Sequence, residues 1–234
     1  MKPDRRDLAA LVVAFLLAAG CVGLGLWQVD RLRQRRARNA GLLASRARPP
    51  LVLRADTPAD SARERRLHAR GRYDYANERV WRPRSYEGIP GVDLVTPLRL
   101  PDGGAVLVDR GWVPSPDAYH VDQAAYREAD SAEVVGLGMK APRGRGDVDP
   151  VRLRDSVPYP LLPFILQQFP SDSPTVRLAL RRVPPPPLTD GPHLSYAIQW
   201  FSFATILVVG SLALVRKRAS ESQKPPAPGD SGYH

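Results

Sequence analysis

The sequence is poor in the residues from which most enzyme and metal centres are built. Its 234 residues include one cysteine, Cys21, and four histidines. A single cysteine excludes an intramolecular disulfide, a cysteine-based zinc site and covalent haem attachment through paired thioethers. The motifs GxSxG, GxxxxGK[ST] and HExxH are also absent, and no spacing links the carboxylates as an acid and a base. We therefore predict that the protein is not an enzyme.

Acidic residues are outnumbered, which raises the question of nucleic-acid binding. The formal net charge is +10, but the densest basic cluster, Arg31–Arg38, directly follows an apolar segment. A nucleic-acid surface would instead need basic residues on a folded face, with aromatic or polar base readers between them. We expect no nucleic-acid partner. The 25 prolines and 18 glycines indicate turns and short strands rather than a helical bundle.

Long hydrophobic runs occur twice. Residues 8–27 carry no charge, and residues 194–215 are apolar and are followed by three basic residues. Each run is long enough to cross a hydrocarbon core of about 30 Å as a helix. A cleaved signal peptide is the alternative for the first run, but no small-x-small site leads into a neutral stretch. We predict transmembrane helices at 8–27 and 193–215.

The charges that flank the two runs bear on topology. Basic residues at 1–7 and 216–218 place both termini in the cytoplasm, whereas the cluster Arg31–Arg38 argues the other way. Long loops cross regardless of their charge. We therefore expect a multi-pass cell-membrane protein with a cytoplasmic N-terminus (1–7), an extracytoplasmic β-rich domain (28–192) and a basic cytoplasmic tail (216–234) that is disordered from residue 219.

Strand patterns dominate the segment between the spans. The strongest is a hairpin of residues 92–100 and 105–113, whose turn Asp102-Gly103-Gly104 supplies positive φ angles. A short helix is expected after an N-cap at Asp56 or Thr57, and a loop with one helical turn at 114–132. Weaker strand patterns occupy 67–75, 134–139, 151–155, 161–169 and 175–183. These patterns predict a mainly antiparallel barrel or sandwich of six or seven strands.

Charged residues within the hairpin have no evident chemical role. Asp93, Asp102 and Asp109 are interpreted as strand or turn residues. We expect Asp109 and Arg110 to form a structural ion pair or to lock a turn.

The entry to the second span combines a histidine with aromatic rings. On a helix that advances about 100° per residue, Tyr196, Trp200 and Phe203 lie within about 80° of His193 on one face. This face is typical of an interfacial aromatic belt, but a neutral imidazole flanked by rings also suits haem. The small-residue pairs Ala19/Gly23 and Cys21/Gly25 would let the two helices approach closely. Residues expected to face lipid are Leu194, Ile198, Phe201 and Ala204.

Four blocks of the sequence resemble one known family. They are LGLWQVDRL at the end of the first run, GRYD at Gly71–Asp74, LVTPLRLPDGGAVLVDRGWVP at Leu94–Pro114 and HLSYAIQWFSFA at His193–Ala204. Their content and order are similar to those of the surfeit locus protein 1 family, which is associated with cytochrome c oxidase assembly. The blocks touch about a third of the chain and include both apolar runs, whereas residues 115–170 resemble the family only loosely.

The resemblance implies a haem a binding chaperone of the respiratory chain that assists haem insertion into oxidase subunit I. The cofactor would be a transiently bound haem a, and the partners would be oxidase subunit I, haem a synthase and the lipid bilayer. It implies His193 as the ligand of haem iron, and a cofactor-binding group that also includes Tyr196, Trp200, Trp27, Gln28 and Arg31. The blocks Gly71–Tyr73 and Asp109–Trp112 would be scaffold or partner surface.

An alternative within the same resemblance is a cofactor-free membrane scaffold that holds oxidase subunits or the haem a synthase. The chain also departs from the family in two places. An arginine-rich run replaces a lysine that commonly follows the first span, and Asp190-Gly191-Pro192 precedes His193 where asparagine is often found.

Overall fold

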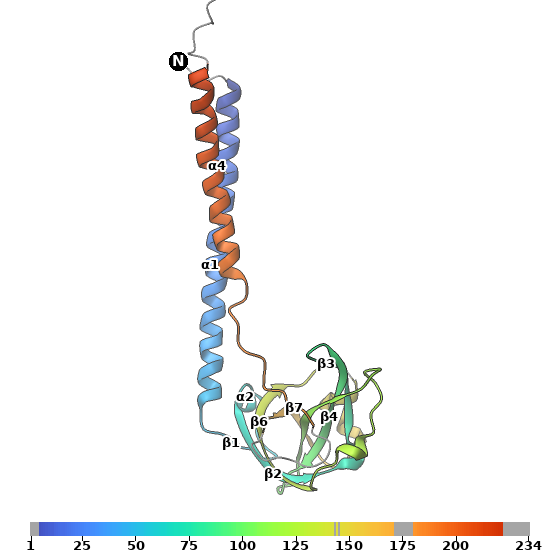
Figure 1. Cartoon of the computed structure of the whole chain (residues 1–234). Coiled ribbons are helices and arrows are strands. Elements are labelled where there is room, and N and C mark those ends of the chain that lie inside the picture. Colours follow the sequence, from blue (N-terminus) through green and yellow to red (C-terminus); the bar gives the residue numbers. More distant parts are fainter. Residues whose placement is uncertain (1–4, 143, 145, 171–179, 222–234) are drawn as a thin grey trace, which may run out of the picture. The chain divides into compact units, whose positions relative to one another are not determined.

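The computed structural model describes residues 5–142, 144, 146–170 and 180–221. The chain divides into two compact units, which are considered separately below. One consists of residues up to Asn39 together with those from Leu188 onward, and the other of residues 40–187. Most of helix α1 and all of helix α4 belong to the first unit, and every strand belongs to the second (Figure 1).

Helix α1 extends from Arg5 to Ala47 and is much longer than the first apolar run. The residues after Trp27 are mainly arginine, alanine and leucine, all good helix formers, so the helix continues beyond the apolar segment. Pro49 and Pro50 follow its end, where residues that lack an N–H donor cannot extend the helix. The basic cluster Arg31–Arg38 is therefore helical.

Helix α4 extends from His193 to Glu221 and begins directly after Pro192. Of the predicted disordered tail, residues 219–221 belong to this helix, and residues 222–234 lie outside the described residues. By length and composition, Asp7–Ala47 and His193–Arg218 could each cross a membrane, with mean hydropathies of 2.5 and 2.0 in their most apolar windows.

Seven strands of the second unit form one sheet in the order β1-β2-β6-β7-β5-β4-β3. A further pairing of β2 with β4 closes five of them, β2, β6, β7, β5 and β4, into a barrel-like ring (Figure 1). Neighbours are antiparallel except for β1 with β2 and β5 with β7. The strands are β1 Leu51–Val52, β2 Arg66–Tyr73, β3 Arg79–Tyr86, β4 Ile89–Arg99, β5 Ala105–Pro114, β6 Ser131–Lys140 and β7 Leu161–Gln168.

The sequence patterns predicted this barrel well in its long strands. The expected hairpin is β4–β5, and the expected strands near 67–75, 134–139 and 161–169 are β2, β6 and β7. In the hairpin turn only Gly103 has a positive φ, of 99°, rather than all three turn residues. The short helix α2 spans Ala59–Ala62, but its N-cap is Pro58 and not Asp56 or Thr57.

Two strand assignments need correction. The segment 151–155 is helical, because Asp149 caps helix α3 (Pro150–Leu153) by accepting the Val151 N–H, and Pro150 occupies the first turn. Strand β3 was not expected, because Pro83 interrupts its pattern; such a proline is tolerated there because β3 is the outermost strand. The predicted strand at 175–183 lies largely outside the described residues.

The short 3₁₀ helices are η1 Tyr75–Asn77, η2 Gln123–Tyr126, η3 Gly146–Val148 and η4 Arg154–Ser156. Of these, η2 lies in the loop for which a helical turn was expected.

Alternation along β5 separates the two faces of the sheet. Val106 and Val108 belong to the main core cluster inside the ring, whereas Leu107 packs on the outer face with Val95 and Leu153. A bulge then interrupts the pairing of β4 with β5, because Leu94 opposes Gly111 while Val95 opposes Asp109. Arg110 is the extra residue. As a result, Asp109 and Trp112, three residues apart, both lie on the outer face.

Arg110 does not pair with Asp109, contrary to the expectation from the sequence. Its side chain is 0% exposed and its Nη2 donates to Glu78 Oε2 at 2.7 Å, while Nη1 donates to Glu128 Oε2 at 3.1 Å. Its Nε donates to Thr96 Oγ1 at 2.8 Å, and the guanidinium lies over the ring of Tyr75. This buried cation is therefore paired with two carboxylates and forms further hydrogen bonds, as a charge inside a core requires.

We predict that Gly71→Ala will destabilise the barrel where β2 crosses to β4. A Cβ at residue 71 would lie 2.2 Å from the carbonyl oxygen of Arg99, a backbone atom that cannot move without breaking the closure. Overpacking of this kind costs about 1–3 kcal/mol. Thermal unfolding of the detergent-solubilised chain, followed by near-ultraviolet circular dichroism, measures the loss. Gly41→Ala in α1 is the control, since no atom lies within 4 Å of its Cβ position, and an unchanged melting temperature for Gly71→Ala would contradict the prediction.

Removal of the buried guanidinium should be far more harmful than removal of an exposed one. Arg110→Met leaves Glu78 without its cation and removes one of the two arginines that pair with Glu128, the other being Arg182. Breaking a buried pair costs about 3–5 kcal/mol. Arg70, whose side chain is 74% exposed, forms a surface pair with Glu133, so Arg70→Met should cost about 1 kcal/mol or less. Urea unfolding of the two variants in the same detergent compares them, and equal losses would show that the Arg110 network is not important for stability.

Candidate functional site

The segment before α4 is held by the arginine-rich part of α1. Arg35 Nε and Asn39 Nδ2 both donate to the carbonyl oxygen of Thr189, at 3.2 and 3.0 Å. Arg36 Nε donates to Asp190 Oδ2 at 2.8 Å. These contacts lie within the helical unit and fix the chain just before the first turn of α4.

At the start of α4, His193 contacts Gln28 of α1, and both were predicted from the sequence. The distance between His193 Nδ1 and Gln28 Oε1 is 2.9 Å. Because a carboxamide oxygen only accepts, this geometry assigns the proton to Nδ1 and leaves the Nε2 lone pair of a neutral ring available. A fixed tautomer and ring orientation are what a histidine ligand obtains from such a partner.

Gly191 lies beside the Nε2 edge of this ring. Its φ is +73°, a conformation that favours glycine, and a Cβ at this position would lie 3.7 Å from His193 Nε2. The chain therefore turns into α4 without placing a side chain against this nitrogen.

The remaining predicted site residues do not all meet. The guanidinium of Arg31 lies over the ring of Trp27, 5.5 Å from its centroid. The ring of Trp200 packs edge-on against Phe203, with centroids 5.9 Å apart. Tyr196 is exposed, and among the described residues its ring contacts no other aromatic ring. Among the six residues there are thus two contacting pairs, Gln28–His193 and Trp27–Arg31. Trp200 packs on Phe203, which is not one of the six, and the Tyr196 ring contacts no other described aromatic ring.

The face of α4 that packs on α1 differs in part from the expected one. Leu194 and Ile198 are exposed, as predicted, but Ala204 is buried and Phe201 packs on Gly25. A Cβ at Gly25 would lie 2.6 Å from Phe201 Cε1, so this glycine allows the ring to lie against α1. Of the small-residue pairs, Cys21/Gly25 is partly or fully buried, whereas Ala19/Gly23 is exposed.

The other described histidines form local contacts in the β unit. His68 Nε2 lies 2.6 Å from Glu133 Oε1 in the β2–β6 pair, and His120 Nδ1 contacts Asp117 in an exposed turn. Both have the partners typical of surface histidines. His234 lies outside the described residues.

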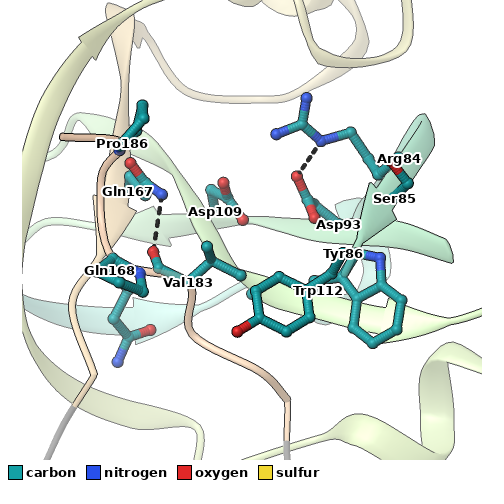
Figure 2. A pocket seen from close by; sticks show the side chains of 12 residues that line it. Arg84, Ser85, Tyr86, Asp93, Asp109, Trp112, Gln167, Gln168, Val183 and Pro186 are labelled. Atoms are coloured by element: carbon teal, nitrogen blue, oxygen red, sulfur yellow. Dashed lines mark hydrogen bonds and ion pairs between the residues drawn. The ribbon is translucent and has the colours of Figure 1, made fainter. Parts of the chain in front are cut away.

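A second polar site, on the outer face of the barrel, was missed from the sequence. Asp93 of β4, Asp109 of β5 and Gln167 of β7 lie in one small cavity with Arg84 of β3 (Figure 2). Arg84 Nε donates to Asp93 Oδ2 at 2.5 Å. The signal was present as acidic residues within otherwise apolar strands, but their proximity depends on register and on the bulge at Arg110.

Burial controls the ionisation of these two carboxyl groups. Burial, together with the neighbouring charge of Asp93, raises the pKa of Asp109 to about 8, although Arg84 and the Gly111 N–H act in the opposite direction. Burial also raises the pKa of Asp93, against the charge and hydrogen bond of Arg84. At neutral pH, Asp109 is therefore mainly protonated.

Comparison with known proteins gives a consistent assignment. The model of the SURF1 family matches residues 15–205. SURF1-like proteins of Mycobacterium tuberculosis and Monosiga brevicollis are 27% and 28% identical to this chain, over 97% and 86% of its length and 91% and 85% of theirs. Surfeit locus protein 1 of Takifugu rubripes is 30% identical over 52% of this chain and 58% of its own.

The matched region includes most of α1, the first part of α4 and the whole sheet, and it begins and ends inside the two apolar segments. This agrees with the four sequence blocks that suggested the assignment. The chain belongs to the SURF1 family, a membrane-associated family known generally for cytochrome oxidase assembly.

Proposed function

We propose that this protein is a cytochrome c oxidase biogenesis factor that binds haem a and assists its insertion into oxidase subunit I. The observation that supports the proposal most directly is the hydrogen bond between His193 Nδ1 and Gln28 Oε1. It leaves Nε2 as the nitrogen with a free lone pair, and this is the donor that haem iron takes from an axial histidine. Haem a is here the cargo, and His193 would be its ligand.

The surroundings of His193 suit a flat, largely apolar cargo with anionic groups. Tyr196 and Trp27 expose large ring surfaces on the same helical unit, and Trp200 adds a third ring. Arg31, held over Trp27, is a cation that would pair with a carboxylate such as a haem propionate. The residues that would hold the cargo are therefore His193 and Gln28 at the iron, the three rings beside the macrocycle, and Arg31 at its charged edge.

The transfer role follows from the exposure of these groups. Trp27 and Tyr196 are 49% and 45% exposed, so a cargo beside them would remain accessible to a partner. A single protein ligand on an open surface can be replaced by the histidines of an acceptor, which is the requirement for a carrier. The partners in this proposal are oxidase subunit I and haem a synthase.

We further propose that α1 and α4 cross the cell membrane and that the β unit lies outside the cytoplasm. The two helices satisfy the length and hydropathy criteria, and basic residues follow the apolar part of α4 at Arg216–Arg218. Placing haem-binding groups at the outer interface puts them where haem can enter from the bilayer.

Haem content should depend on His193. When the chain is purified from cells that make haem a, its absorption spectrum should show bound haem, and His193→Ala should lower haem per protein at least tenfold. Gln28→Leu should weaken binding by about 10–100-fold in affinity, as loss of a ligand's hydrogen-bond partner typically does. The matched control is His120→Ala, which removes an imidazole that is 88% exposed in the β unit.

Three outcomes separate the proposal from a cofactor-free scaffold. Equal haem in the parent chain and in His193→Ala would show that another group binds it. A haem-free parent chain that still supports oxidase assembly would favour the scaffold. Loss of haem in His120→Ala would indicate general unfolding rather than a lost ligand.

Topology can be tested independently of haem. Reporter fusions at Pro116 and after residue 221 should show the first outside and the second inside the cytoplasm, because the basic residues on both termini face inward. Alkaline phosphatase is active only outside, and green fluorescent protein is fluorescent mainly inside. The reverse pattern would mean that the cluster Arg31–Arg38 determines orientation, and it would place His193 at the inner interface.

A further inference from the structure

A cavity of about 120 Å³ lies on the outer face of the barrel, and all its lining residues belong to the β unit. It is bounded by strands β3, β4, β5 and β7, and the segment Val183–Pro186 lies along its other side (Figure 2). Paired backbone hydrogen bonds between Trp112 and Arg181, of 2.9 and 2.8 Å, hold the start of that segment against β5. The cavity is therefore built from elements that are fixed to one another.

Two buried oxygen atoms of this cavity lack a hydrogen-bond partner among the described residues. They are Asp109 Oδ1 and Gln167 Oε1. Asp109 is only 6% exposed, and the Nε2 of Gln167 is already used in a 3.0 Å hydrogen bond to the carbonyl oxygen of Val183. Leaving buried acceptors unpaired costs about 1–3 kcal/mol each, so these two oxygens indicate a ligand that donates hydrogen bonds.

The polar donors near the cavity do not supply those bonds. The indole nitrogen of Trp112 lies against Gly91, where a Cβ would come within 2.3 Å of it, and it is itself buried without a hydrogen-bond partner among the described residues. Arg84 is occupied by Asp93. Asp93, Asp109 and Gln167 thus present acceptors from three neighbouring strands, beside the rings of Tyr86 and Trp112.

We propose that this cavity binds a primary alkylammonium group. An ammonium has three N–H donors, which matches acceptors supplied by Asp93, Asp109 and Gln167. The alkyl stem would lie against the apolar wall of Val183, Pro184 and Pro186, and the rings of Tyr86 and Trp112 favour a cation nearby. The ammonium could come from a small amine or from a lysine side chain, since the chemistry of the bound group is the same.

The charges around the cavity favour a monovalent organic cation over a divalent metal ion. Arg84 neutralises Asp93, so one carboxylate charge, that of Asp109, remains for the ligand. A dication would also lie close to the Arg84 guanidinium, which repels it. Anions are disfavoured because two of the three polar atoms of the cavity that lack a partner in the described part of the chain, Asp109 Oδ1 and Gln167 Oε1, are acceptors, and only the Trp112 indole nitrogen is a donor.

Binding should depend on pH through Asp109. Burial and Asp93 raise the pKa of Asp109 to about 8, so at lower pH a cation has to displace a proton from this carboxyl group. The other charged groups near it are Asp93 on β4, Arg84 on β3 and Arg181, whose guanidinium lies over Tyr86 and 4.0 Å from Glu87. Affinity for ammonium should therefore rise by about tenfold per pH unit as pH increases toward 8, and then level off.

Nuclear magnetic resonance of the full chain in detergent micelles can test this proposal. Four tryptophans give four indole signals, and Trp112→Phe identifies the one beside the cavity. Titration with n-butylammonium chloride should shift the Trp112 signal to saturation, whereas n-butanol and potassium chloride should not. Asp109→Asn should weaken the affinity at least tenfold. The variant is nearly isosteric, and unchanged signals of the other tryptophans confirm that it folds.

The matched control is Asp155→Asn, which removes an exposed carboxylate elsewhere on the barrel and should leave the affinity unchanged. A capped lysine, Nα-acetyl-lysine N-methylamide, distinguishes the sources. Binding at least as tight as that of butylammonium identifies a lysine side chain, and failure to bind identifies a small free amine. The proposal is overturned if butylammonium produces no saturable shift, if n-butanol acts equally, or if calcium chloride produces the same shift at lower concentration.

Discussion

The β unit depends on one extra residue in strand β5. Arg110 occupies the bulge, which directs its guanidinium into the barrel while Asp109 and Trp112 lie on the outer face. Inside, Arg110 pairs with Glu78 and Glu128, and it thereby connects β5 with the segment between η1 and β3 and with the segment between η2 and β6. Outside, the same irregularity brings Asp109 beside Asp93. A regular strand would place residues 109 and 112 on opposite faces, and the polar cavity could not form.

In the helical unit, the constraint is the orientation of one imidazole, that of His193 at the start of α4. Rings at a helix start are free to rotate unless a partner fixes them, and Gln28 provides an acceptor for Nδ1 from the neighbouring helix. Arg35, Arg36 and Asn39 hold the residues just before His193, so its backbone is restrained as well. The arginine-rich cluster, which conflicts with a simple charge rule for topology, thus has a local structural role.

Periodicity in the sequence predicted the helices and strands whose burial pattern is regular. It failed where one or two residues determine the local structure, such as a helix cap or a bulge. Strands β2, β4, β5, β6 and β7 and both apolar helices were found because alternation or continuous hydrophobicity extends over many residues, whereas β3 was missed. Residues 151–155 alternate like a strand but form a helix, because Asp149 and Pro150 initiate one. Gln28 and His193 were expected in one cofactor-binding group, yet the cavity of Asp93, Asp109 and Gln167 was not predicted. Its members are contributed by three strands, and register across a sheet with a bulge is not determined by the pattern of any one strand.

The chain has a formal net charge of +10, which would be expected to repel a cation. The distances between the surface charges and the cavity explain why a cation site is still compatible with this charge. Exposed charges separated by more than about 8 Å are largely screened at physiological ionic strength, so most of the surface arginines contribute little inside the cavity. The groups that matter are those in contact: Asp109, Asp93 and the Arg84 that pairs with it. Inside the cavity, removal of water strengthens the interaction of Asp109 with a bound cation and also makes its unpaired carboxylate costly. The same desolvation that protonates Asp109 in the free protein therefore makes an N–H donor cation the group that stabilises its charged form.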